Sequence, residues 1–196
     1  MKIDFDLNSD NIEKSEPVTD DELMRFREQI MIDLPPSFLD FKKQYADSFY
    51  ISTGNALSIF PLCDNKDSFT NVVNISRDYA HLGNVLDSHR LLIFGMSGVD
   101  SETWAFYTDK KYLNGEYPIL WISPREERFF LHSTSFESFI NIQFKSLTDT
   151  DSIDDYDEFY KTLIKKYDNQ IEPFGYDSVY SDAHDLIDLE TIMNKI

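Results

Sequence analysis

The sequence predicts an α+β domain in which a mixed or antiparallel sheet of about four to six strands is flanked by helices. Short apolar segments of strand length alternate along the chain with segments of helical periodicity. The gaps between apolar segments in the centre of the chain are short, which favours antiparallel pairing because a parallel crossover needs roughly a dozen residues. Sixteen Phe and eleven Tyr among 196 residues are enough for one sizeable core.

The N-terminal region is predicted to contain an acidic arm and two helices. Residues 1–17 are polar and acidic, end at Pro17, and are expected to form an arm or an edge strand. Thr19 or Asp20 can cap the first helix, because either side chain can accept a hydrogen bond from a free backbone N–H group. The Leu-Pro-Pro segment at 34–36 ends this helix and begins a second one, since proline is tolerated in a first helical turn. The apolar faces of the two helices are Leu23, Phe26 and Ile30, and Phe38, Phe41 and Tyr45.

The centre of the chain is predicted to supply the sheet. Residues 91–94 form a continuous apolar run typical of a central strand. An Asn-Gly pair at 114–115 provides turn chemistry before another apolar run. Residues 67–82 have helical character. The expected strands are residues 56–60, 91–94, 103–107, 117–122 and 128–132.

The C-terminal part is predicted to extend the domain with acidic helices. Ser135 can cap a helix, and after an acidic linker six apolar residues between 156 and 167 follow at the spacing of an amphipathic helix. This apolar stripe should pack on the domain or on a partner, because exposing large apolar side chains to water is unfavourable. Pro173 and Gly175 separate this helix from a last helical segment, expected to contain Leu186, Leu189, Met193 and Ile196. The predicted organisation is an acidic N-terminal arm (1–17), an α+β domain (18–148) and an acidic helical C-terminal extension (149–196).

The charge of the chain favours a cationic partner. Eighteen Lys and Arg stand against 36 Asp and Glu, which gives a net charge of −18 and argues against binding to nucleic acids and anionic membranes. Residues 149–196 carry half of this excess, with 13 acids and 4 bases. The acidic start is unlike a signal peptide, a single cysteine does not build a disulfide framework, and no apolar run spans a bilayer. A cytoplasmic location is therefore expected.

Motifs for catalysis and metal binding are incomplete. The segment 95–98 is followed by Val99, where a nucleophile elbow needs Gly, and is expected to be a turn between strands. The acidic segment 149–154 lacks the Gly and Glu of a calcium loop. His132 is expected to be an ordinary half-buried or edge histidine, and Cys63 a quiet thiol. We therefore predict no catalytic residue, no metal site and no cofactor, with a small hydrolase as the least supported alternative.

Several segments resemble, in their order, those of the SUKH superfamily, which includes Smi/Knr-type cell-wall assembly regulators of yeast and many bacterial immunity proteins. These segments are LPPSFLDF at 34–41, a Gly-Asn turn at 54–55, LIFG at 92–95, GVD at 98–100 and STSFESFI at 133–140. The resemblance covers residues 18–147 and implies an α+β fold without catalytic residues. It also implies two functions. Bacterial members neutralise polymorphic toxins, often nucleases, whereas fungal members act in regulation.

A partner-binding face is expected around the turns of the sheet. Acidic side chains at exposed turns can steer a cationic partner. Two tryptophans on neighbouring strands could anchor the centre of such a face, since Trp is enriched at interfaces. Alternatively, the acids only keep the protein soluble and the tryptophans belong to the core. The candidate residues are Asp100, Glu102, Trp104, Asp109, Glu116, Trp121, Glu126 and Glu127.

Overall fold

The structure is a computed structural model that describes most of the chain. The described residues are 1–52, 56–63, 71–78, 91–97, 102–109, 111–123, 128–148, 156–168 and 180–182. Within these ranges the helices are α1 (Asp20–Gln29), α2 (Pro36–Gln44), α3 (Val72–Asp78), α4 (Phe136–Thr148) and α5 (Tyr156–Tyr167). The strands are β1 (Ile12–Lys14), β2 (Phe49–Ile51), β3 (Leu57–Ile59), β4 (Leu91–Ser97), β5 (Thr103–Tyr107), β6 (Ile119–Ser123), β7 (Arg128–Ser133) and β8 (Tyr180–Asp182).

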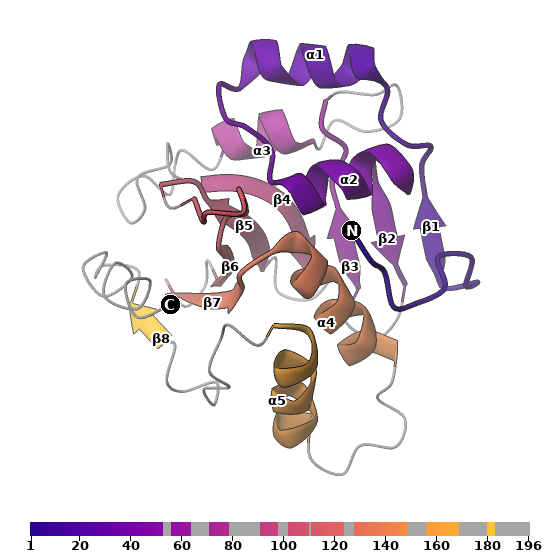
Figure 1. Ribbon diagram of the computed structural model, residues 1–196, viewed down its shortest axis with the longest axis vertical. Coiled ribbons are helices and arrows are strands. Elements are labelled where there is room, and N and C mark those ends of the chain that lie inside the picture. The colour runs from indigo at the N-terminus through magenta and orange to yellow at the C-terminus, as the bar shows by residue number, and fades with distance from the viewer. Residues whose placement is uncertain are drawn as a thin grey trace.

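The eight strands form one antiparallel sheet in chain order, from β1 at one edge to β8 at the other (Figure 1). The α+β fold and the antiparallel pairing are therefore confirmed. The sheet is larger than expected, because the three-residue strands β2 and β8 are too short to produce a recognisable alternation in the sequence. The N-terminal arm contributes β1, which confirms the edge-strand alternative.

Strand β4 continues through the segment that was expected to be a turn. Gly95 and Met96 pair with β3 and β5, and the register shifts between Ile93 and Gly95. A Cβ atom on Gly95 would lie 2.5 Å from the backbone oxygen of Ser58 on β3, so a larger residue would push the strands apart. The glycine therefore marks a bulge in a central strand, and the turn prediction for residues 95–97 is wrong.

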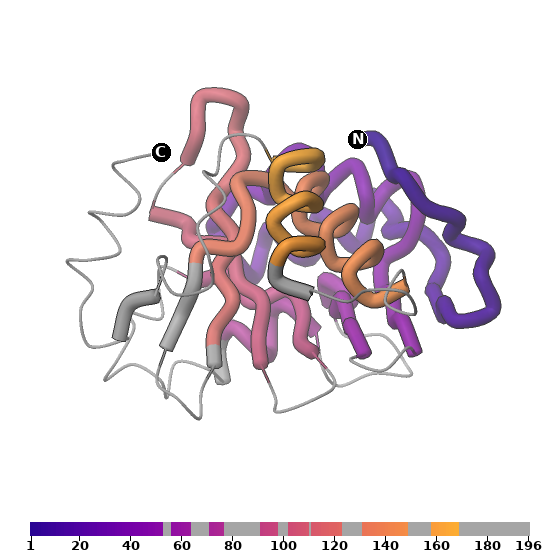
Figure 2. Tube along the Cα trace, turned by 90° about the horizontal axis from the view of Figure 1, so that it is seen from below, coloured from indigo at the N-terminus to yellow at the C-terminus, as the bar shows by residue number. Residues whose placement is uncertain are grey.

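Helices α2, α4 and α5 lie on one face of the sheet (Figures 1 and 2). The rings of Phe38 on α2 and Phe136 on α4 are 4.8 Å apart, and Phe139 on α4 lies 5.2 Å from Phe94 on β4. All four side chains are completely buried. Phe38, predicted for the apolar face of α2, therefore forms the core between the helices and the sheet together with two phenylalanines of α4.

The N-terminal arm and helix α5 both pack on this core. The ring of Phe5 in the N-terminal arm stacks on Phe144 of α4 at 3.8 Å. Helix α5 has the predicted bounds, and its Leu163 and Ile164 are buried. The stripe of α5 is therefore docked on its own domain. The C-terminal extension also contributes strand β8, which was not expected. The last helical segment, predicted around Leu186 to Ile196, lies outside the described residues.

The helix caps at Thr19 and Ser135 are confirmed. The Thr19 hydroxyl accepts from the Glu22 N–H at 3.3 Å, and the Glu22 carboxylate accepts from the Thr19 N–H at 2.8 Å. The Ser135 hydroxyl accepts from the Ser138 N–H at 3.1 Å. Helix α2 differs, because its cap residue is Pro35, whose side chain makes no capping hydrogen bond. Another part of the chain therefore has to satisfy the first N–H groups of α2.

Candidate functional site

The predicted acidic face is only partly within the described structure, and its described members do not gather in one patch. Asp100, Glu126 and Glu127 lie outside the described residues. Glu102 and Asp109 flank opposite ends of β5, which at about 3.4 Å per residue separates them by roughly 17 Å or more. Glu102 accepts a hydrogen bond from the Ser97 hydroxyl at 3.1 Å.

Two further candidates are buried, which corrects their placement on an exposed face. Trp104 is 5% exposed and packs edge-on against Phe139 and His132, so the core alternative holds for it. Trp121, opposite Trp104 in the register of β5 and β6, is partly exposed. Glu116 is also 5% exposed, although it follows a turn. The reason for its burial is a set of hydrogen bonds to helix ends.

Glu116 acts as the missing cap of α2 and also reaches α4. Its carboxylate accepts from the Ser37 N–H and from the Ser37 hydroxyl, both at 2.8 Å. A further hydrogen bond comes from the backbone N–H of Phe136, the first residue of α4. Burial raises the pKa of Glu116, and these hydrogen bonds oppose the rise. One carboxylate thus joins the N-termini of two helices, where negative charge is favoured.

The loop before β6 holds Glu116 in this position. Gly115 has a φ of 85°, a left-handed conformation that favours glycine, which confirms the turn predicted at Asn114-Gly115. The Asn114 side-chain oxygen accepts from the Glu116 N–H at 3.1 Å. The ideal Cβ position of Gly115 is 3.2 Å from Pro36, so the loop lies directly on the start of α2. An ion pair between Lys111 and Asp33, at 3.3 Å, links the loop to the α1–α2 connection.

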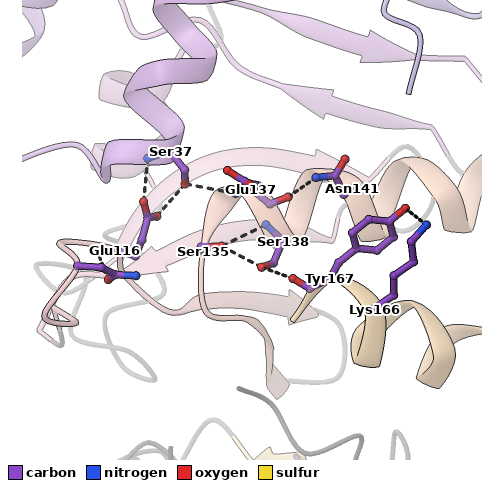
Figure 3. A pocket seen from close by; sticks show the side chains of 9 residues that line it. Ser37, Glu116, Ser135, Glu137, Ser138, Asn141, Lys166 and Tyr167 are labelled. Atoms are coloured by element: carbon purple, nitrogen blue, oxygen red, sulfur yellow. Dashed lines mark hydrogen bonds between the residues drawn. The ribbon is translucent and has the colours of Figure 1, made fainter. Parts of the chain in front are cut away.

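Beside Glu116 lies a polar pocket of about 330 Å³, formed where α2, the 111–117 loop, α4 and α5 meet (Figure 3). Its walls contain hydroxyl, amide and carboxylate groups, whereas pockets for drug-like ligands are mainly apolar. The lining residues are Ser37, Asn114, Glu116, Ser135, Glu137, Ser138, Asn141, Lys166 and Tyr167. We take this pocket, called the α2–α4 pocket below, as the candidate functional site.

The end of the α2–α4 pocket formed by α5 is tied to the N-terminal arm. The Lys166 ammonium group lies 3.1 Å from the Asp4 carboxylate, and the Tyr167 hydroxyl donates to the same carboxylate. These two hydrogen bonds, first that of Tyr167, hold the pKa of Asp4 below its usual value. The Ser138 hydroxyl donates to the Tyr167 carbonyl at 2.8 Å. The C-terminal end of α5 is thereby held against the first turn of α4.

A second polar cluster surrounds His132, which is 7% exposed and therefore more buried than expected. Its Nε2 atom lies 2.6 Å from both the Tyr160 hydroxyl and the Gln143 amide nitrogen, and its Nδ1 atom lies 3.1 Å from the Ser133 hydroxyl. These partners assign the proton to Nδ1. Burial lowers the pKa of His132 to about 3. The neutral ring joins β7 to α4 and α5.

A third buried group is Lys42 on α2. Its ammonium group donates to the backbone carbonyls of Asp47 and Phe60 and lies 3.6 Å from the Asp47 carboxylate. Burial lowers the pKa of Lys42 to about 8. The Asp47 carboxylate also accepts from the Leu62 N–H, so these groups fix the segments beside β2 and β3. Within the described residues, no group of three or more His, Cys, Asp or Glu is arranged to hold a metal ion.

Sequence reasoning missed most residues of the α2–α4 pocket. Only Glu116 was a candidate, and it was placed on an exposed face. Ser37 and Ser135 belong to the LPPSFLDF and STSFESFI segments, so their position at helix starts was the available signal. Lys166 and Tyr167 end an amphipathic helix and carry no signal of their own, because only the docking of α5 brings them to the pocket.

The geometry defines an α+β domain built on an antiparallel sheet, with a polar pocket at the joined N-termini of two helices. A comparison with family models matches residues 17–142, which is more than half of the chain, to the SMI1 / KNR4 family (SUKH-1). The chain belongs to this family, as the segments in its sequence suggested. A comparison with curated proteins gave no match. The family match ends within α4, so α5 and β8 lie beyond it.

Proposed function

We propose that this protein is a non-catalytic binding module that neutralises a polymorphic toxin as its immunity protein. The observation that carries the proposal is membership of the SMI1 / KNR4 family (SUKH-1). The resemblance of the sequence to the SUKH superfamily implies that bacterial members act as immunity proteins. The partner would be a basic toxin domain, and a nuclease fits best because enzymes that bind nucleic acid need a cationic surface. The protein would act in the cytoplasm. The structure contains, in its described part, no helix that could cross a membrane.

The charge of the chain supports this partner class. A net charge of −18 attracts a basic protein over a distance and can raise the association rate about 10- to 1000-fold over that of neutral pairs. Rapid association is an advantage for a protein that must occlude a toxin before the toxin acts.

The described polar groups support a role in binding over a role in catalysis. Ser97, the serine of the incomplete nucleophile elbow, lies within β4 and donates its hydroxyl hydrogen bond to Glu102. His132 is buried, neutral and engaged by Tyr160 and Gln143, so it is not placed to exchange protons with a substrate. These groups hold the domain together and leave the surface for recognition.

The second candidate function is an intracellular regulatory or scaffold protein. It is favoured by the same family match, because the family is described by its SMI1 and KNR4 members and the resemblance extends to regulators of cell-wall assembly. Both candidates are binding functions, so the identity of the partner separates them.

Co-expression tests the proposal directly. Each gene next to this one would be expressed in a susceptible host with and without this protein, and growth would be measured. Rescue of growth from one neighbouring toxin, but not from an unrelated toxin, is expected. If no neighbouring gene is toxic, and a pull-down from the source lysate instead recovers wall-synthesis enzymes or kinases, the regulatory function replaces the immunity function.

A further inference from the structure

We infer that the α2–α4 pocket receives a cationic side chain, an arginine, from the protein partner. The inference rests on the proposed function for the existence of a protein partner, but its chemistry comes from the pocket alone. The net charge of the chain favours basic proteins in general. The pocket would add one specific position on the surface at which the partner is recognised.

The serine hydroxyls and the Asn141 amide of the pocket wall are hydrogen-bonded to other protein groups. Ser37 donates to Glu116, Ser138 donates to the Tyr167 carbonyl, and Ser135 lies 2.9 Å from the Ser138 hydroxyl. The Asn141 amide donates to the carbonyls of Lys2 and Glu137. The pocket therefore presents few hydrogen-bond donors to an incoming group.

The backbone N–H groups of α4 are also occupied, so the helix start does not offer an anion site. The N–H of Phe136 binds Glu116, that of Glu137 binds the Ser37 hydroxyl at 3.2 Å, and that of Ser138 binds Ser135. An anion at a helix N-terminus needs such groups. Here side chains of the protein itself, the Glu116 carboxylate and two serine hydroxyls, already occupy them.

Hydrogen-bond acceptors, in contrast, remain available. A carboxylate offers about four lone-pair positions, and Glu116 uses three of them. Glu137 accepts at Oε2 from the Lys2 N–H at 3.0 Å. The negative charge of Glu137 also contributes to raising the pKa of Glu116, so the two carboxylates are close enough to repel each other. A cation between them would relieve this repulsion.

Lys166 leaves this carboxylate end of the pocket free for a cation. It lies at the opposite end from Glu116, beside Tyr167 (Figure 3). Its charge is opposed there by Asp4 at 3.1 Å. Because the charge of Lys166 is balanced by Asp4, the carboxylates of Glu116 and Glu137 give the pocket wall a net negative charge. Arginine suits the wall best because its planar guanidinium group has five donors and no acceptor.

The surroundings of the pocket suit a protein partner. The 111–117 loop, which supplies Asn114 and Glu116 to the wall, projects from the helical face of the sheet (Figure 2). Leu113 at its tip is fully exposed, and so is Met31 on the α1–α2 connection to which the loop is bound. Leu113 and Met31 could contact apolar residues of a partner while the α2–α4 pocket binds an arginine that lies between those residues.

The test uses the ¹⁵N-labelled full chain and a small probe, N-acetyl-arginine amide, followed by NMR. N-acetyl-citrulline amide is the matched control ligand, because it has nearly the same shape without the charge. Glu137→Gln is the test variant, since Glu137 is partly exposed and its replacement should leave the fold intact. Glu28→Gln on the exposed face of α1 is the control for loss of one negative charge elsewhere.

The arginine probe is expected to shift the amide signals of Ser37, Glu116 and Glu137 saturably. Glu137→Gln should weaken binding about tenfold, equivalent to about 1.4 kcal/mol, and Glu28→Gln should leave it unchanged. The inference is overturned if these signals do not saturate, if citrulline binds equally well, or if Glu28→Gln weakens binding as much as Glu137→Gln. Because no toxin is used, this result is independent of the co-expression test.

Discussion

Replacement of His132 by Gln is expected to make the stability of the protein less sensitive to acid. In the folded protein, burial lowers the pKa of His132 from 6.5 to about 3. As the pH falls below about 6.5, His132 therefore binds a proton in the unfolded chain but stays neutral in the folded chain. The contribution of the neutral His132 ring to the free energy of unfolding is therefore complete above pH 6.5, and it is lost progressively as the pH falls towards 3.

The magnitude follows from these two pKa values. One proton that binds only to the unfolded state lowers the free energy of unfolding by about 1.4 kcal/mol for each pH unit. Between pH 7 and pH 5 the loss comes to about 2 kcal/mol, because titration begins only near 6.5. This is a sizeable share of a typical stability of about 5–15 kcal/mol.

Urea denaturation at pH 7, 6 and 5, followed by circular dichroism, measures this difference. Between pH 7 and pH 5, the free energy of unfolding of the wild type should fall by about 2 kcal/mol more than that of His132→Gln. The variant should be less stable at pH 7, because Tyr160 and Gln143 lose the imidazole nitrogen they contact. All other titrating residues are shared, so their effects cancel in the comparison. Equal losses in the two proteins would show that His132 is not held neutral in the folded state.

Three further predictions concern the core, the helix caps and the partner. Phe139→Ala should lower the free energy of unfolding by about 3–5 kcal/mol, because Phe139 is completely buried between α4 and the sheet; a melting temperature near that of the wild type would contradict this packing. Glu116→Ala should lower the free energy of unfolding by about 1–3 kcal/mol, because it leaves the N–H of Ser37 without an acceptor. Glu28→Ala, on an exposed helix face, is the control and should change stability very little. Equal effects of the two substitutions would show that Glu116 does not cap α2. Once a protein partner is identified, raising salt from about 50 to 500 mM should slow association measured by stopped flow and change dissociation much less. An association rate that does not depend on salt would show that the net charge does not steer this partner.

The helices could be predicted from the sequence because their signals are local. Thr19 and Ser135 cap helices through contacts only three residues away, and the stripe from Tyr156 to Tyr167 repeats over several turns. Strands with four or more apolar residues were also found. The three-residue strand β2 was missed, since so short a segment is defined by its partners β1 and β3 more than by its own residues.

The site could not be predicted in the same way, because its residues come from four distant parts of the chain. Glu116 was expected on the surface from its place after a turn. Pro35 provides no side-chain cap for α2, and the 111–117 loop lies against Pro36, so the carboxylate turns inward to Ser37. Trp104 was a candidate anchor, but its ring is enclosed by His132 and Phe139 once α4 covers β5.

The fold class, the family and the strongly acidic character of this protein could be read from the order and composition of its residues, since periodicity, motif order and net charge do not depend on tertiary contacts. Which acids face solvent and which cap helices, in contrast, is set by how the chain packs. That choice depends on free N–H groups at the starts of α2 and α4, which require a partner wherever they are buried. A carboxylate 79 residues away in the chain supplies it, because folding places Glu116 beside Ser37.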